Sequence, residues 1–274
     1  TPSTEVTEEA AKYDEMYCEW APNEKVAMEV AFGACLAGKR SFCGMKHVGL
    51  NVAADPLFTV SYTGVNAGMV IVVADDAGMH SSQNEQDSRH HAIASKIPML
   101  EPSDSAEARA FTMRAFELSE QFDTPVIIKM CTRVAHSQSI VEPGERVEPP
   151  VKPYEKNIGK YVMMPGNAKK RHPIVEQRTR DLIAFAENCE FNRVEWGDTS
   201  IGIIASSTCY QYAKEVFGEK ASILKLGMIN PLPEKLILDF AAKVDKLVVI
   251  EELDPIIENH CKQLGLTVTG KDVL

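Results

Sequence analysis

The chain has 274 residues, of which 45% are hydrophobic and 25% charged, and its formal net charge is −10. This length predicts one large domain or two ordinary ones with packed cores. The acidic balance argues against nucleic acid as a partner, and no apolar run reaches the roughly 18 residues that a membrane helix needs. No signal-peptide pattern opens the chain, so neither export nor a membrane partner is expected.

Cysteine usage indicates the redox compartment. The seven cysteines are scattered and form no C-x-x-C pair: Cys18, Cys35, Cys43, Cys131, Cys189, Cys209 and Cys261. An odd count without a pairing pattern is typical of reduced thiols, which predicts a cytoplasmic protein. The pattern contains no iron–sulfur ligand motif.

The first elements are helices. Residues 4–17 predict a surface helix, and a second helix is expected from Pro22 to about Gly38, because proline suits a first helical turn. Apolar spacing predicts its buried face, formed by Val26, Ala27, Val30, Ala31 and Ala34. Glu24 lies in the first turn at the edge of this face. It is either an acid that favours the helix dipole or a half-buried carboxylate beside a ligand, with raised proton affinity.

A predicted strand gives way to a helix within residues 42–51. Lys46 and His47 lie at this transition among glycines, which allow a ligand to approach the backbone closely. Open α/β sheets bind ligands at such places. An ordinary strand-to-helix turn is the alternative.

Residues 68–76 form the clearest strand, because a continuous apolar run is typical of a parallel sheet covered on both faces. The polar loop of residues 78–91 follows it directly, and loops in this position often carry sites. Ser81, Ser82 and Gln83 offer short hydrogen-bonding groups there. The adjacent histidines of this loop point in different directions and lack a third ligand, so no metal site is predicted.

Strands and helices alternate through the remaining chain. A short strand at 97–102, a helix at 106–121 capped by Ser103 or Ser105, and a strand at 125–130 complete a first domain, residues 1–140. A proline-rich linker and a helix follow at 141–191. Residues 192–274 form a smaller unit with strands at 200–207, 222–226 and 246–250. The predicted fold class is α/β, with two parallel-sheet domains.

Four stretches of this sequence carry a family resemblance: residues 1–4, 23–27, 45–51 and 80–87. They resemble the alpha subunits of indolepyruvate ferredoxin oxidoreductases, which belong to the thiamine diphosphate-dependent 2-oxoacid:ferredoxin oxidoreductases. The resemblance covers essentially the whole chain. It implies a pyrimidine-type thiamine diphosphate-binding domain at 1–140 and a transketolase C-terminal-like domain at 192–274.

The resemblance implies oxidative decarboxylation of aryl 2-oxoacids to acyl-CoA, with coenzyme A as acyl acceptor and ferredoxin as electron acceptor. Indolepyruvate, phenylpyruvate and hydroxyphenylpyruvate all remain open as substrates. Glu24 matches the family's catalytic glutamate, which hydrogen-bonds N1′ of the cofactor's aminopyrimidine. The resemblance places Lys46 and His47 at the cofactor and four further residues at the substrate: Thr1, Ser81, Ser82 and Gln83.

The family also departs from this chain. Its alpha subunit continues into segments that hold Mg²⁺, the cofactor diphosphate and 4Fe–4S clusters, and these segments are missing here. The chain opens on Thr1 without an initiator methionine, so we expect a fragment that is inactive alone. The implied partners are a beta subunit and a second copy, in a homodimer or an alpha2beta2 assembly. A non-catalytic docking or regulatory relative, or another 2-oxoacid:ferredoxin oxidoreductase, is the alternative.

Overall fold

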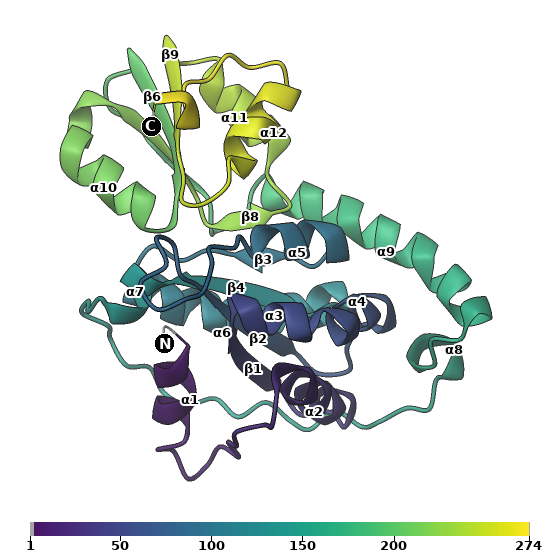
Figure 1. The fold of residues 1–274 in the computed structure, drawn as a ribbon. Coiled ribbons are helices and arrows are strands. Elements are labelled where there is room, and N and C mark those ends of the chain that lie inside the picture. The colour runs from purple at the N-terminus through teal and green to yellow at the C-terminus, as the bar shows by residue number, and fades with distance from the viewer. Residues whose placement is uncertain (1–2, 274) are drawn as a thin grey trace.

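The computed structural model describes residues 3–273, which form two β-sheets covered by helices (Figure 1). Sheet A contains five strands, β1 (Ser41–Lys46), β2 (Met69–Asp75), β3 (Met99–Leu100), β4 (Val126–Cys131) and β8 (Met228–Asn230). Sheet B contains four, β5 (Arg193–Glu195), β6 (Ile201–Ser206), β7 (Ser222–Leu226) and β9 (Lys246–Ile250). The predicted α/β fold class is therefore confirmed.

The strand order corrects one detail of that prediction. Sheet A has the order β1-β2-β4-β3-β8 and sheet B the order β5-β7-β6-β9. All neighbours pair in parallel except β8 with β3 and β5 with β7. Each sheet thus has one antiparallel edge strand, and purely parallel sheets were the wrong expectation.

Strand β8 also links the two sheets. Only Gly227 separates it from β7, so the chain passes directly from sheet B into the edge of sheet A. Because β8 is an edge strand, it pairs with β3 alone. An edge position can hold either a parallel or an antiparallel strand. Part of the predicted second domain therefore completes the first sheet, while the boundaries at residues 140 and 191 remain a prediction.

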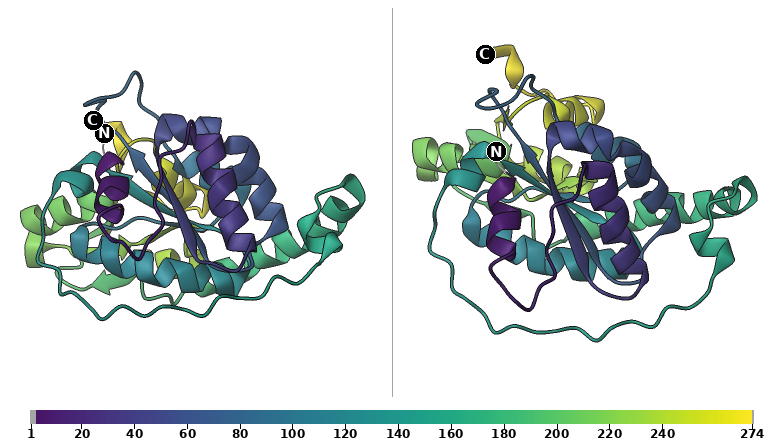
Figure 2. Two further views of the ribbon diagram at one scale, coloured as in Figure 1. Left: turned by 90° about the horizontal axis from the view of Figure 1, so that it is seen from below. Right: turned by 60° about the horizontal axis from the view of Figure 1, so that its bottom comes forward.

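Helices cover both faces of sheet A. One face carries α2 (Glu24–Leu36), α3 (His47–Val52), α4 (Ala54–Thr63) and α5 (Arg89–Ser95). The other carries α1 (Thr4–Ala10), α6 (Ser105–Phe122) and α9 (Pro165–Ala186). Figure 2 shows the extended segment between the short helices α7 (Thr132–His136) and α8 (Ile158–Tyr161), which runs along the outside of the molecule.

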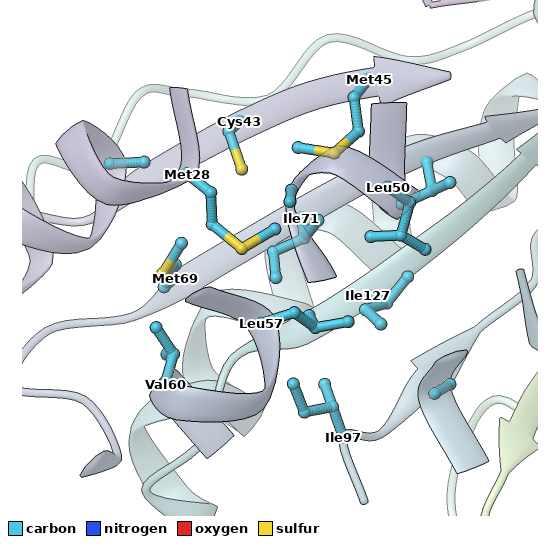
Figure 3. Close-up of a cluster of buried hydrophobic side chains, with 14 of the residues drawn as sticks. Met28, Cys43, Met45, Leu50, Leu57, Val60, Met69, Ile71, Ile97 and Ile127 are labelled. Carbon is cyan, nitrogen blue, oxygen red and sulfur yellow. The ribbon is translucent and has the colours of Figure 1, made fainter. Parts of the chain in front are cut away.

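Alternation along β2 explains why two layers of helices are needed. Ile71 faces the cluster that contains Met28, Leu50 and Leu57, as Figure 3 shows. Its neighbour Val70 belongs to the cluster on the opposite face. Successive side chains of a strand point to opposite faces, so an all-apolar strand must be covered on both sides.

Sheet B repeats this arrangement on a smaller scale. Helix α10 (Ser207–Phe217) packs on one face, and α11 (Glu234–Ala241) and α12 (Ile256–Gln263) pack on the other. Within residues 3–273, no helix has both the length and the apolar character required to cross a membrane.

The structure revises several helix predictions. Helix α1 ends at Ala10, since residues 11–17 are all exposed and offer no buried face that would support a longer helix. Asp104, rather than either predicted serine, caps α6 by accepting a hydrogen bond from the Glu107 N–H. An aspartate oxygen in extended backbone reaches this N–H well.

Helix α2 begins two residues later than predicted and buries a different stripe. Asn23 is its cap, since the Asn23 side chain accepts a hydrogen bond from the Val26 N–H at 3.0 Å. The residues that face the sheet are Met28, Ala31 and Cys35. Val30 is 49% exposed, so the predicted face was wrong there. The predicted and the observed face share Ala31. The observed face contains the long side chain of Met28, which fills the core.

The predicted linker is partly helical. Helix α9 starts at Pro165, where the missing N–H is not needed, and continues through Pro173. An internal proline removes a helical hydrogen bond. Buried contacts on both sides compensate, because Arg171 donates to the Tyr62 carbonyl at 2.7 Å and Arg178 to the Ser61 carbonyl at 2.7 Å. These tertiary contacts thus outweigh the tendency of Pro173 to end the helix.

A charged contact joins α6 to sheet B. Glu107 accepts hydrogen bonds from Lys225 and from Arg193, each at 2.7 Å. Burial alone would raise the pKa of Glu107, but attraction to Lys225 and these hydrogen bonds hold it at about 2. Glu107 therefore stays ionised at neutral pH and stabilises the folded state there.

We predict that Asn23→Ala lowers the free energy of unfolding by about 1 kcal/mol, because the first turn of α2 loses its cap. Urea unfolding followed by circular dichroism measures this loss. Asn23→Ser keeps a capping oxygen and should stay within a few tenths of a kcal/mol of the wild type. An equal loss in both variants would contradict the capping role.

We predict that Glu107→Gln destabilises the fold by up to about 3 kcal/mol at pH 7. The folded pKa lies below the ordinary value of 4.5, so this stabilisation is complete above that value and is lost as the pH falls towards 2. Urea unfolding of both proteins should therefore give a smaller difference at about pH 3.5 than at pH 7. A difference independent of pH would show that the Glu107 charge contributes nothing.

Candidate functional site

Glu24 is the first residue of α2, and its side chain lies against α3. A Cβ atom placed on Gly49 would lie 2.5 Å from Glu24 Cγ and 2.7 Å from Oε1. Any side chain at position 49 would therefore displace the carboxylate. Among residues 3–273, no hydrogen bond or ion pair engages this partly buried carboxylate. It is consequently free to bond a ligand.

His47 begins α3 immediately after β1, as the sequence predicted. Its side chain is 1% exposed, and neither ring nitrogen has a hydrogen-bond partner in the described part of the chain. Buried polar groups are nearly always paired, so an unpartnered imidazole is an exception that needs a reason. His47 lies two positions before Gly49, on the short helix that touches Glu24.

Lys46 is the last residue of β1 and points to the loop that follows β2. Its Nζ donates to the Ser81 carbonyl at 2.7 Å and lies 3.9 Å from Asp76 Oδ2. An ammonium group has three donors and only one of them bonds Ser81, so two N–H groups of Lys46 are left for further acceptors. The Lys46 side chain is 11% exposed.

Asp76 organises this loop. Its carboxylate accepts the backbone N–H of Ser81 at 2.8 Å and the hydroxyls of Ser82 at 2.6 Å and Thr132 at 2.8 Å. Burial alone would raise its pKa, but the hydrogen bonds from Ser82, Ser81 and Thr132 keep it well below the usual range. Asp76 is therefore a fixed negative charge around which the loop turns.

The predicted substrate residues that the structure describes do not all have the same surroundings. Ser81 and Ser82 lie together with Lys46 around Asp76, and the Ser82 hydroxyl donates inwards to that carboxylate. Gln83 is exposed and makes no hydrogen bond within the described residues. Thr1 lies outside the residues that the structure describes. The substrate role of all four remains a prediction.

A network of buried charges that was not predicted from the sequence lies next to this loop. Lys129 in β4 is fully enclosed, and its Nζ lies 2.5 Å from Glu101 Oε1 and 3.9 Å from Asp75 Oδ2. Burial alone would lower the pKa of Lys129, but Glu101 and Asp75 raise it. A lysine inside the apolar run of residues 125–130 was the available signal, because a buried ammonium requires a carboxylate partner.

One group in the described chain has the composition of a metal site, namely Asp87, His90 and Asp254. However, Arg89 Nε lies 3.0 Å from both oxygens of Asp87. The guanidinium thus supplies the positive charge that a metal ion would bring. His90 Nε2 and Asp254 Oδ2 are hydrogen-bonded to each other at 2.7 Å. These contacts do not favour a metal site.

Known proteins share this fold. The chain is similar to the structure of 2-oxoglutarate:ferredoxin oxidoreductase from Magnetococcus marinus, with a TM-score of 0.77 and 18% identity over 98% of this chain and 57% of that chain. It also resembles a split-gene transketolase, with a TM-score of 0.58 and 16% identity. At such identities the likeness shows the fold alone.

Sequence relatives are more similar. Proteins named indolepyruvate oxidoreductase subunit IorA from Archaeoglobus fulgidus and Methanothermobacter thermautotrophicus are both 42% identical over 99% of this chain. The chain covers 46% of each, so it spans about half the length of these curated relatives. Residues 1–187 match the family described as pyruvate flavodoxin/ferredoxin oxidoreductase, thiamine diphosphate-binding. The chain therefore belongs to the thiamine diphosphate-binding family of pyruvate flavodoxin/ferredoxin oxidoreductases.

Proposed function

We propose that the chain is part of an enzyme that oxidatively decarboxylates aryl 2-oxoacids, indolepyruvate first among them, to acyl-CoA with ferredoxin as electron acceptor. The names of its relatives support this substrate class. The observation that carries the proposal is the unpartnered Glu24 carboxylate held against Gly49. Since the relatives are about twice as long, the activity belongs to a longer protein than the one described.

The residues around Glu24 fit thiamine diphosphate. A cofactor pyrimidine needs a carboxylate that no protein group already occupies, and Glu24 meets this requirement. Gly49 leaves the Glu24 side chain room that any Cβ would fill. Glu24 would hydrogen-bond N1′ of the aminopyrimidine and hold or release a proton there. When bound, the cofactor supplies the nucleophile and the electron sink for decarboxylation.

The neighbouring residues provide polarity and charge. We assign Lys46 and His47 to the cofactor side, where the two spare N–H groups of Lys46 and the unpartnered His47 nitrogens can bond ligand atoms. Ser81, Ser82 and Gln83 are assigned to the substrate side with Thr1. Because the Ser82 hydroxyl donates to Asp76, Ser82 can only accept a hydrogen bond from a substrate.

The remaining cofactors and partners are proposals of the same kind. We infer that Mg²⁺, the cofactor diphosphate and the 4Fe–4S clusters bind in other parts of the full-length subunit. Coenzyme A, a beta subunit and a second copy of the subunit complete the proposed assembly, and ferredoxin receives its electrons. The cysteines of the described chain are all free, which supports a cytoplasmic location.

We predict that Glu24→Gln in the full-length enzyme lowers kcat by at least about a hundredfold, because a carboxamide cannot exchange the proton. The assay is indolepyruvate-dependent reduction of ferredoxin in the presence of coenzyme A. Glu29→Gln, one turn later on α2 and exposed, is the matched control and should keep normal turnover.

Three results of these assays would contradict parts of the proposed function. Normal turnover of Glu24→Gln would remove Glu24 from the mechanism. A wild-type enzyme that binds thiamine diphosphate but turns over no 2-oxoacid would instead favour a non-catalytic relative. Higher kcat/KM with an aliphatic than with an aryl 2-oxoacid would contradict the substrate class.

A further inference from the structure

The loop after β2 is held at its two ends by different parts of the molecule. Asp76 fixes the first half through the N–H of Ser81 and the Ser82 hydroxyl. Near the end of the loop, Asp87 is 6% exposed and contacts residues that follow β9 of sheet B. Beside it, Ser88 donates its N–H and its hydroxyl to Asp75 of β2 at 3.0 and 2.5 Å. The candidate substrate residues therefore lie between Asp76 and a second anchor, in which Ser88 depends on sheet A and Asp87 depends on sheet B.

Arg89 makes most of the second anchor. Its side chain is 1% exposed, and its Nη2 lies 2.6 Å from Asp87 Oδ2. Nη1 donates to Glu251 Oε2 at 2.6 Å, and Nη2 also donates to the carbonyls of Glu252 and Asp254 at 2.7 Å. The Asp254 N–H in turn donates to Asp87 Oδ2 at 3.2 Å. We call Asp87, Arg89, Glu251 and the backbone of Asp254 the Arg89 clamp.

Glu251 gives the clamp its rigidity. Besides Arg89, it accepts the backbone N–H groups of Ile257 at 3.0 Å and Glu258 at 2.9 Å. These groups belong to the first turn of α12. Arg89 is consequently tied through Glu251 to the end of β9 and to α12. Its Nε and Nη2 donors form a fork that holds the Asp87 carboxylate in one orientation. The contact joins positions 162 residues apart in the chain.

We propose that sheet B acts on the candidate site through the Arg89 clamp, and that Glu251 is a positioning residue for the loop that carries Ser81, Ser82 and Gln83. Glu251 fixes Arg89, Arg89 fixes Asp87, and Asp87 fixes the end of the loop. The inference rests on the proposed function only in assigning this loop to the substrate. It gives the second α/β unit a part in catalysis without any contact with the reacting atoms.

Hydrogen exchange measured by mass spectrometry on the full-length subunit tests the clamp. Glu251→Gln keeps the shape of the side chain but weakens the charged contact with Arg89. Peptides from residues 77–86 should exchange about tenfold faster in this variant. Peptides from β2 and β4 should be unchanged. Glu252→Gln is the matched control, because the Glu252 side chain bonds Thr208 and not Arg89.

Two results would overturn the proposal. Unchanged exchange at residues 77–86 would show that the loop does not depend on Glu251. Faster exchange spread equally over sheet A and sheet B would show a general loss of stability instead. Should Glu251→Gln fail to fold, Arg89→Lys gives the same test, because lysine keeps the charge but lacks the fork that spans Asp87 and Glu251.

Steady-state kinetics separate this inference from the proposed function. In the full-length enzyme, Glu251→Gln should raise the KM for the aryl 2-oxoacid about tenfold and change kcat less than about threefold. A wild-type enzyme inactive on 2-oxoacids would end the proposed function but leave the exchange experiment valid. An active wild type with an unchanged KM in Glu251→Gln would reject the positioning role alone.

Discussion

Two buried cations, Lys129 and Arg89, constrain the arrangement of the whole molecule. Neither is exposed, and a buried positive charge is tolerated only beside carboxylates. Lys129 holds the ends of β3 and β2 together through Glu101 and Asp75. Arg89 adds a contact with Glu251, which directly follows β9 of sheet B. The carboxyl edge of sheet A is thereby fixed on several sides by charge pairing as well as by packing.

Because most buried polar groups here have partners, the side chains that lack one are informative. Asp76 is saturated with donors, whereas Glu24 and His47 have no partner in the described chain. Native proteins leave few buried polar groups unsatisfied, and those that remain often mark ligand sites. The Gly49 contact holds one such group, the Glu24 carboxylate, at the start of α2, where we propose that it meets the cofactor. Fold, family and free carboxylate therefore support the same function.

Helices and strands that are marked by neighbouring residues could be predicted from the sequence. The apolar run of β2 requires cover on both faces, and the glycine-bordered turn at Lys46 and His47 begins a helix as expected. Pairings between distant residues could not be predicted in this way. Arg89 and Glu251 are 162 positions apart, and β8 reaches sheet A only because the folded chain brings it to β3. Pro173 likewise continues α9 because of tertiary contacts that no local pattern reveals.

Calorimetric titration of thiamine diphosphate and Mg²⁺ into the full-length subunit and its Gly49→Ala variant is the most direct test of a cofactor site at Glu24. We expect one cofactor bound per wild-type subunit and an affinity at least about tenfold weaker in the variant, because the added Cβ displaces the Glu24 carboxylate. No binding to the wild-type protein, or equal affinity in both proteins, would contradict the claim that Glu24 and Gly49 form part of a thiamine diphosphate site.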